Sequence, residues 1–132
     1  MVTMVQTFQG DYLYKFDDKG RIIVPQIFRE KLGLKFNVSV DIDDECLTIY
    51  PMDEWDRVHE DINSKPRFDK ETKMMKRRFY ANSATCDVDK QGRIRIPAGL
   101  REKANLLGKE VYFVGAGEIA EIWEKEKWES IR

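Results

Sequence analysis

The sequence predicts an α+β protein, mainly β, in which one structural unit occurs twice. Residues 17–31 return as residues 89–103, with charged, glycine, β-branched and proline positions in the same order. This correspondence continues without a gap to Leu34 and Leu106, and after one extra residue it resumes at residues 47–50 and 120–123. Each copy is only about 45 residues long, near the lower limit for an independent core. We therefore expect the two copies to fold onto each other as a pseudo-symmetric pair.

Each copy begins with a strand, a glycine turn and a second short strand. Residues 13–16 and 21–24 are rich in β-prone side chains, and residues 17–20 between them are typical of a hairpin connection. Gly20 and Gly92 are the expected positive-φ positions of the two turns. Asp17 and Asp89 open the turns, where an aspartate side chain accepts hydrogen bonds from backbone N–H groups two or three residues further on. Turn formation is therefore the first role that we expect for both aspartates.

A short helix and a pair of strands complete each copy. Pro25 and Pro97 suit the first turn of a helix, and Gly33 and Asn105 suit the left-handed position that ends one. Strands are expected at residues 37–41, 46–50, 110–114 and 119–123, with a turn at residues 115–118. Each repeat is thus predicted to run strand, turn, strand, helix, strand, strand.

Helices are expected after each repeat. Residues 52–64 and 69–80 predict two helices on either side of Pro66, and residues 127–131 resemble a shorter version of the same appended helix. We accordingly divide the chain into a first repeat at residues 9–54, a helical connector at 55–82, and a second repeat at 83–128.

Composition excludes several classes of protein. With 36% charged residues and a net charge of only −1, both signs are mixed over the surface, so any polyanion site must be a local cluster of cations. Cys46 and Cys86 are far apart and share the chain with one histidine, His59, which argues against a zinc site. No cofactor or metal is expected. The sequence shows neither a leader pattern nor an apolar run long enough to cross a membrane, so we expect a cytoplasmic protein.

The turns carry matched cations. Arg21 and Arg93 directly follow the turn glycines, and Lys19 and Lys90 lie within the turns. A guanidinium donates paired hydrogen bonds to phosphate or to guanine, so two such turns on one face predict a DNA-binding surface. The alternative is that each arginine closes a surface salt bridge to its own aspartate. The copies differ at one position, where the second has Arg95 in place of an isoleucine, and we expect the second to be the more positive.

Two other groups of charges have more ordinary interpretations. The Arg-Glu steps at residues 29–30 and 101–102 favour an intramolecular charge network or a subunit contact. The connector also carries a dense basic cluster, which we interpret as a solvated helix face, with a second nucleic-acid surface as the alternative. This cluster consists of Lys73, Lys76, Arg77 and Arg78.

The strongest enzyme hypothesis is that Asp17 and Asp89 share a proton as an aspartic-protease-like pair. The D-[ST]-G sequence of that chemistry is absent, and an arginine four residues beyond each aspartate favours its ionised form. The chain also lacks the glycine-rich spacing of nucleotide-binding loops. We therefore expect no enzyme activity and no small-molecule substrate.

The pattern D-x-x-G-R-I-x-[VI]-P-x-x-[FL]-R-E at residues 17–30 and 89–102 resembles the AbrB-type swapped-hairpin DNA-binding motif. Its tandem occurrence, together with residues 50–55 and 121–123, resembles the MraZ family over nearly the whole chain. This resemblance implies two AbrB-like βαβ repeats that form an intramolecular pseudo-dimeric swapped-hairpin barrel. The barrels are expected to assemble into a ring-shaped homo-oligomer.

The same resemblance implies a transcriptional regulator that associates with the nucleoid. Such a protein binds tandem direct repeats of double-stranded DNA in the promoter of the division and cell-wall gene cluster, commonly as a repressor. The family's D-x-x-x-R motif falls on Asp17 with Arg21 and on Asp89 with Arg93, and its arginines are those implicated in DNA contact. The alternative is an AbrB-like antitoxin or protein-interaction module, although such a protein usually has one motif and a disordered tail.

Overall fold

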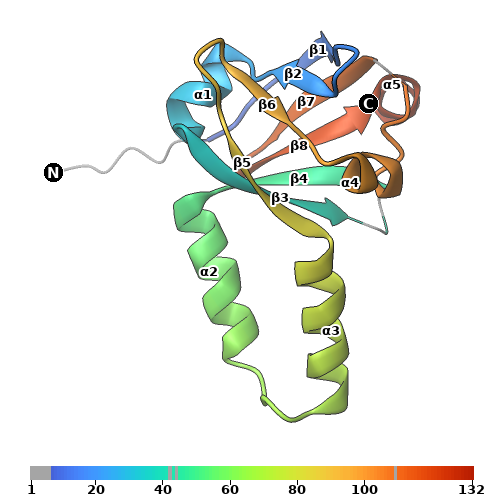
Figure 1. The fold of residues 1–132 in the computed structure, drawn as a ribbon. Coiled ribbons are helices and arrows are strands. Elements are labelled where there is room, and N and C mark those ends of the chain that lie inside the picture. The colour runs from blue at the N-terminus through green and yellow to red at the C-terminus, as the bar shows by residue number, and fades with distance from the viewer. Residues whose placement is uncertain (1–6, 42, 44, 109) are drawn as a thin grey trace, which may run out of the picture.

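The computed structural model of the chain describes residues 7–41, 43, 45–108 and 110–132. Its strands are β1 (Asp11–Lys15), β2 (Arg21–Ile23), β3 (Lys35–Asp41), β4 (Cys46–Pro51), β5 (Ser83–Asp87), β6 (Arg93–Arg95), β7 (Glu110–Ala116) and β8 (Ile119–Glu124). Its helices are α1 (Gln26–Leu32), α2 (Met52–Asn63), α3 (Lys70–Ala81), α4 (Ala98–Lys103) and α5 (Lys125–Ile131) (Figure 1). Residues 11–51 and 83–124 run through the same predicted order of strand, strand, helix, strand and strand.

The two repeats share one antiparallel sheet. Its order is β1-β7-β8-β4-β3-β5, so the first strand of each repeat pairs with the third strand of the other. Tyr12 of β1 lies opposite Phe113 of β7, and Ala84 of β5 lies opposite Val38 of β3. The expectation that the two halves fold onto each other is confirmed, and the pairing is reciprocal.

The predicted hairpin between residues 13–16 and 21–24 differs from the structure. The turn itself closes, with the Asp17 N–H donating to the Arg21 carbonyl at 2.8 Å. The strands on either side of it take ladder partners in the other repeat: β1 joins β7, and β2 joins β6 in a separate two-stranded ribbon. Strand-forming residues and a turn glycine specify local conformation, but they do not specify the partner strand.

The core lies between one face of the sheet and the ribbon with helices α1 and α4. Phe28 of α1 is at its centre, with edge-to-face ring contacts to Phe8, Tyr12 and Phe113 at centroid distances of 5.3, 5.6 and 6.3 Å. Ile22 and Ile94 join the same cluster from the ribbon. Both strands of the ribbon are therefore fixed on the sheet by their inward side chains.

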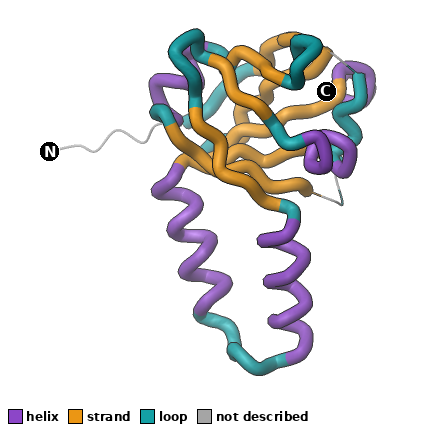
Figure 2. Tube along the Cα trace, in the orientation of Figure 1, coloured by secondary structure: helices purple, strands orange, loops and turns teal. Residues whose placement is uncertain are grey.

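Helices cover parts of the opposite face of the sheet. Trp128 of α5 packs on a second cluster that includes Tyr112 and Trp123. Helices α2 and α3 form a hairpin that extends beyond the strands, on the side of the molecule away from the ribbon (Figures 1 and 2). The ring of Trp55 in α2 stacks on Phe79 in α3 at 5.3 Å, which joins the two helices close to the sheet.

Candidate nucleic-acid interface

The first turn is held by the aspartate that opens it. The Asp17 Oδ1 atom accepts hydrogen bonds from the backbone N–H groups of Lys19 and Arg21, both at 2.9 Å. Gly20 has a φ of 77°, in the left-handed region that β-carbon sterics disfavour for other residues. These are the hydrogen bonds that the sequence predicts for an aspartate that opens a turn.

The second turn repeats this geometry. The Asp89 Oδ1 atom accepts from the N–H groups of Gln91 and Arg93, again both at 2.9 Å. Gly92 has a φ of 78°. The chain therefore builds the same rigid turn twice, with an arginine leaving it at the same position each time.

Each arginine is partly occupied by its own turn. Arg21 Nε donates to Asp17 Oδ2 at 2.7 Å, and Arg93 Nε donates to Asp89 Oδ2 at 2.9 Å. The arginine side chains are only 29% and 25% exposed, so they lie along the surface. The ion pair that the sequence offered as the alternative is therefore present. It uses Nε, and the Nη1 and Nη2 groups of each guanidinium take no part in it.

The aspartates are held in their ionised form. The backbone N–H of Arg21 and the other hydrogen bonds to the carboxylate lower the pKa of Asp17 from 3.8 to about 2. The pKa of Asp89 is lowered in the same way, chiefly by the backbone N–H of Arg93. A carboxylate that accepts several hydrogen bonds does not hold a proton near neutral pH. The geometry therefore favours turn formation over a shared-proton pair.

The β2–β6 ribbon pairs the two short strands that leave the turns. Its register places Arg21 opposite Arg95 and Ile23 opposite Arg93, with Ile22 opposite Ile94 between them. Ile22 and Ile94 are each 1% exposed, and side chains alternate between the faces of a strand. The outward face of the ribbon therefore carries the side chains of Arg21, Ile23, Arg93 and Arg95.

The cations of the site are close in space. Strand spacings of about 3.4 Å along and about 4.8 Å across put the Cα atoms of Arg21, Arg93 and Arg95 within about 9 Å of one another. Because the strands run antiparallel, the two turns lie at opposite ends of the ribbon. Lys19 and Lys90 are exposed in these turns, one at each end. The three arginines thus lie between two turns that each carry an exposed lysine.

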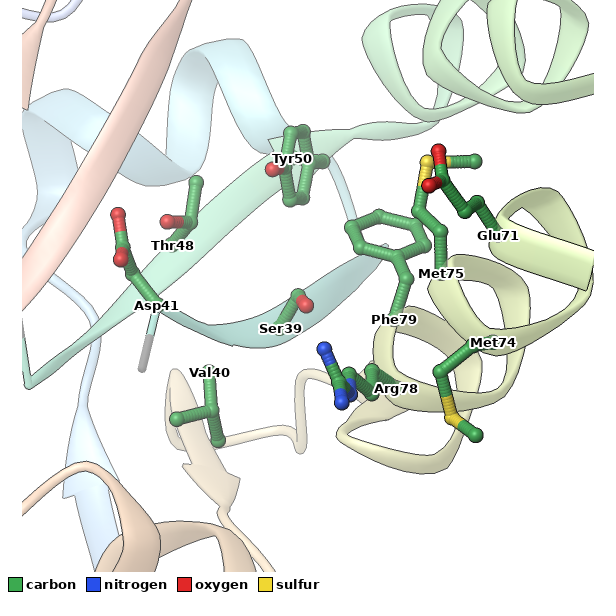
Figure 3. Close-up of a pocket in the computed structure, with 10 residues that line it drawn as sticks. All are labelled: Ser39, Val40, Asp41, Thr48, Tyr50, Glu71, Met74, Met75, Arg78 and Phe79. Atoms are coloured by element: carbon green, nitrogen blue, oxygen red, sulfur yellow. The ribbon is translucent and has the colours of Figure 1, made fainter. Parts of the chain in front are cut away.

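The basic cluster of the connector is separate from this surface. It lies on α3, and in Figure 1 that helix and the ribbon are on opposite sides of the molecule. Lys73, Arg77 and Arg78 are exposed and Lys76 is half-buried, so most of the cluster is a solvated helix face. Arg78 also borders a hollow of about 630 Å³ between α3 and strands β3 and β4, where Met74, Met75 and Phe79 form the apolar wall (Figure 3).

Sequence reasoning missed two arginines next to the turns. Arg29 of α1 and Arg101 of α4 were expected to serve a charge network or a subunit contact. The guanidinium of Arg101 lies against Gly20, and that of Arg29 lies against Gly92. The recurrence of an arginine at the same position of both repeats was the sequence signal for a shared role. It could not identify the contact, because the glycine that each arginine touches belongs to the other repeat.

In the part of the chain that the structure describes, no group of three or more histidine, cysteine, aspartate or glutamate residues is arranged to hold a metal ion. No described helix combines the length and the apolar composition that crossing a bilayer requires. Cys46 and Cys86 are both buried, and burial raises the pKa of the Cys86 thiol to about 11.

Comparison with known proteins gives a consistent result. The family model described as "MraZ protein, putative antitoxin-like" matches twice, at residues 7–78 and 79–132. A protein of Lachnoclostridium phytofermentans named transcriptional regulator MraZ is 48% identical over 123 residues, which are 93% of this chain and 85% of the relative. The protein of the same name from Acetivibrio thermocellus is 45% identical over the same shares of both chains.

Proposed function

The chain belongs to the MraZ family, and on that premise we propose that it is a sequence-specific DNA-binding transcriptional regulator without enzyme activity. The observation that carries this proposal is the outward face of the β2–β6 ribbon, where three arginines meet between two lysine-bearing turns. A two-stranded ribbon fits the major groove of B-DNA, which is about 12 Å wide. We propose Arg21, Arg93, Arg95, Lys19 and Lys90 as the DNA-contacting residues, with Asp17, Gly20, Asp89 and Gly92 as the turn residues that present them.

The ion pairs within the turns suit this role. Asp17 holds the Nε side of Arg21, which fixes the direction of the guanidinium and leaves Nη1 and Nη2 for an acceptor. A planar guanidinium that is already oriented loses little conformational entropy when it binds a guanine edge or a phosphate. The turn aspartates therefore orient the arginines in addition to shaping the backbone.

We propose further that residues 9–54 and 83–128 form a pseudo-dimer of swapped hairpins, joined by residues 55–82. The reciprocal pairing of β1 with β7 and of β5 with β3 supports this division. The chain would act in the cytoplasm, associated with the nucleoid, on tandem repeats in the promoter of the division and cell-wall genes, as a repressor. An antitoxin-like role with a protein partner is the competing proposal, and the family description gives it some weight.

The test is a titration of fluorescently labelled DNA from upstream of the chain's own gene. Arg21→Ala combined with Arg93→Ala is expected to weaken binding at least about 30-fold, because each paired contact is worth about 1–3 kcal/mol of discrimination. Wild type should prefer the native duplex over a scrambled one and bind more weakly as salt increases.

The matched control is Arg57→Ala, which removes an ion-paired arginine from α2. It should bind DNA like the wild type. Equal binding of native and scrambled duplexes, or no binding by the wild type, would contradict sequence-specific DNA binding. A toxin-like protein partner would then be sought.

We also propose that the chain forms a homo-oligomer, ring-shaped, through the hollow beside α3. Met74 is exposed, and with Met75 and Phe79 it lines this hollow (Figure 3). These apolar side chains support a contact between subunits at this face. Repetition of the ribbon around an oligomer would let weak single contacts add up on a repeated DNA site. Light scattering of Met74→Glu should show smaller particles than the wild type. Phe68→Glu, on the loop between α2 and α3, should leave the particle mass unchanged.

A further inference from the structure

Arg101 of the second repeat lies on the turn of the first. A methyl group built on Gly20 would be 2.8 Å from Arg101 Nη2 and 3.0 Å from its Cζ, so the guanidinium fills the space where any side chain would start. Arg101 Nε donates to the Ile96 carbonyl at 3.2 Å, and Cζ lies 5.5 Å from the centroid of the Phe16 ring. The guanidinium is thus held by its own repeat and by Phe16, the residue that precedes the other repeat's turn.

Arg29 of the first repeat makes the matching contact with the turn of the second. A methyl group on Gly92 would be 2.7 Å from Arg29 Cζ and closer still to Nη1. The Gly92 carbonyl also accepts a hydrogen bond from the Val24 N–H at 2.9 Å, a second link from the first repeat. Each turn is therefore contacted by an arginine from a helix of the opposite repeat, and the second turn also accepts a backbone hydrogen bond from the first repeat.

From these two contacts, and resting on the proposed function, we propose that Arg29 and Arg101 are crossed positioning residues. Arg101 holds the turn that presents Arg21, and Arg29 holds the turn that presents Arg93. A planar group lying flat on a glycine contacts the backbone itself, so a turn braced in this way resists displacement as a unit. Each repeat then controls the DNA-contacting arginine of its partner repeat.

The two contacts are equivalent in position but differ in support. Phe16 lies beside Arg101, whereas the residue at the equivalent position of the second repeat is Val88. A hollow of about 420 Å³ is found there, lined in part by Arg29, Val88 and Gly92. Arg29 Nε is buried, and within the described residues it has no hydrogen-bond partner. Arg101 is the better-defined of the two and is the first residue to test.

The first experiment needs no DNA. It compares amide hydrogen exchange at Arg21 and Arg93, whose N–H groups donate to Asp17 and Asp89 within the two turns. Arg101→Ala should speed exchange about tenfold at Arg21 and leave Arg93 unchanged, and Arg29→Ala should do the opposite. Faster exchange in the turn of the variant's own repeat, or in both turns equally, would overturn the crossed arrangement.

The second experiment is a double-mutant cycle on DNA affinity at low salt, where weakened variants still bind. Arg101→Ala alone should weaken binding about tenfold, within the usual range for coupled residues. In an Arg21→Ala background the same change should cost less than about twofold, because the turn no longer presents an arginine. In an Arg93→Ala background it should again cost about tenfold.

Arg101→Lys separates positioning from a direct contact. Lysine keeps the charge but lacks the planar group that covers Gly20, so it should not restore affinity. If Arg101→Lys binds as wild type, or if Arg101→Ala and Arg21→Ala are additive, then Arg101 acts as a cation in its own right and the proposal fails. If the wild type does not bind DNA, the proposed function fails, and the exchange experiment still decides whether the turns are braced across the repeats.

Discussion

The orientation of the β2–β6 ribbon can be tested by replacing neighbouring isoleucines that face opposite ways. Ile22 and Ile94 are 1% exposed, whereas Ile23, one residue along the same strand, is 46% exposed. Replacement by alanine removes the same three carbon atoms at each position. The three variants therefore differ only in where those atoms lie.

The expected costs follow from burial. Three fully buried carbons contribute about 2.4 kcal/mol of transfer free energy, and the cavity left behind raises the usual range for Ile→Ala to about 2–5 kcal/mol. We expect Ile22→Ala and Ile94→Ala to fall in that range. Ile23→Ala loses about half of the transfer contribution and leaves no closed cavity, so its cost should be about 1 kcal/mol or less.

Urea unfolding followed by tryptophan fluorescence measures these differences. With a slope of about 2 kcal/mol per molar urea, a loss of 3 kcal/mol lowers the midpoint by about 1.5 M. Because assembly would stabilise the folded chain, all variants must be compared at one protein concentration. Equal costs for Ile22→Ala and Ile23→Ala would refute the reasoning, since a register slip by one residue turns every side chain to the other face. The arginine surface would then be wrongly placed as well.

Three further predictions concern the turns, the helices and the thiols. Because the pKa of Asp17 is lowered from 3.8 to about 2 by folding, its contribution to stability is complete above about pH 5 and is lost as the pH falls towards 2. The difference in unfolding free energy between the wild type and Asp17→Asn should therefore shrink as the pH falls through that range. A difference that does not change with pH would contradict this. Gly20→Val should destabilise the fold and weaken DNA binding, because Gly20 has a positive φ and the Arg101 guanidinium lies beside it. Gly99→Ala in α4 should instead raise the free energy of unfolding by about 0.5–1 kcal/mol, because nothing lies within 4 Å of the added methyl group. The raised pKa of Cys86 should slow its alkylation at pH 8 about a hundredfold relative to the urea-unfolded chain, as measured by peptide mass spectrometry.

Local features of this fold could be predicted because they depend on residues close in sequence. The turns opened by Asp17 and Asp89, the positive φ of Gly33 and Asn105, and the extents of α2 and α3 all follow from short motifs. The turn at residues 115–118 was misplaced in part, since β7 continues through Gly115 to Ala116. There Gly115 and Ala116 pair with Ala120 and Ile119 of β8, and the Gly115 N–H also donates to the Gly10 carbonyl at 2.8 Å, so the turn is shorter than its glycines suggest.

Partner choice could not be predicted in the same way. Nothing within residues 11–23 distinguishes a hairpin from two strands that each pair with the other repeat, because strand propensity and a turn glycine serve both. The contacts of Arg29 and Arg101 with the turn glycines depend on that partner choice, so they too were missed. The salt bridge from Arg21 to Asp17, which the sequence offered as the alternative, is present. It is compatible with the DNA contact that we propose for Arg21.

The exchange of strands between repeats has a consequence for how the chain is made. Strand β1 is complete at residue 15, but its ladder partner β7 begins only at residue 110. At about 5–20 residues per second, translation leaves β1 without that partner for several seconds to about 20 seconds. During this time β3 and β4 can already pair with each other, since they are separated by only a short connection. The last segments to leave the ribosome, not the first, therefore decide when the amino-terminal edge of the sheet can close.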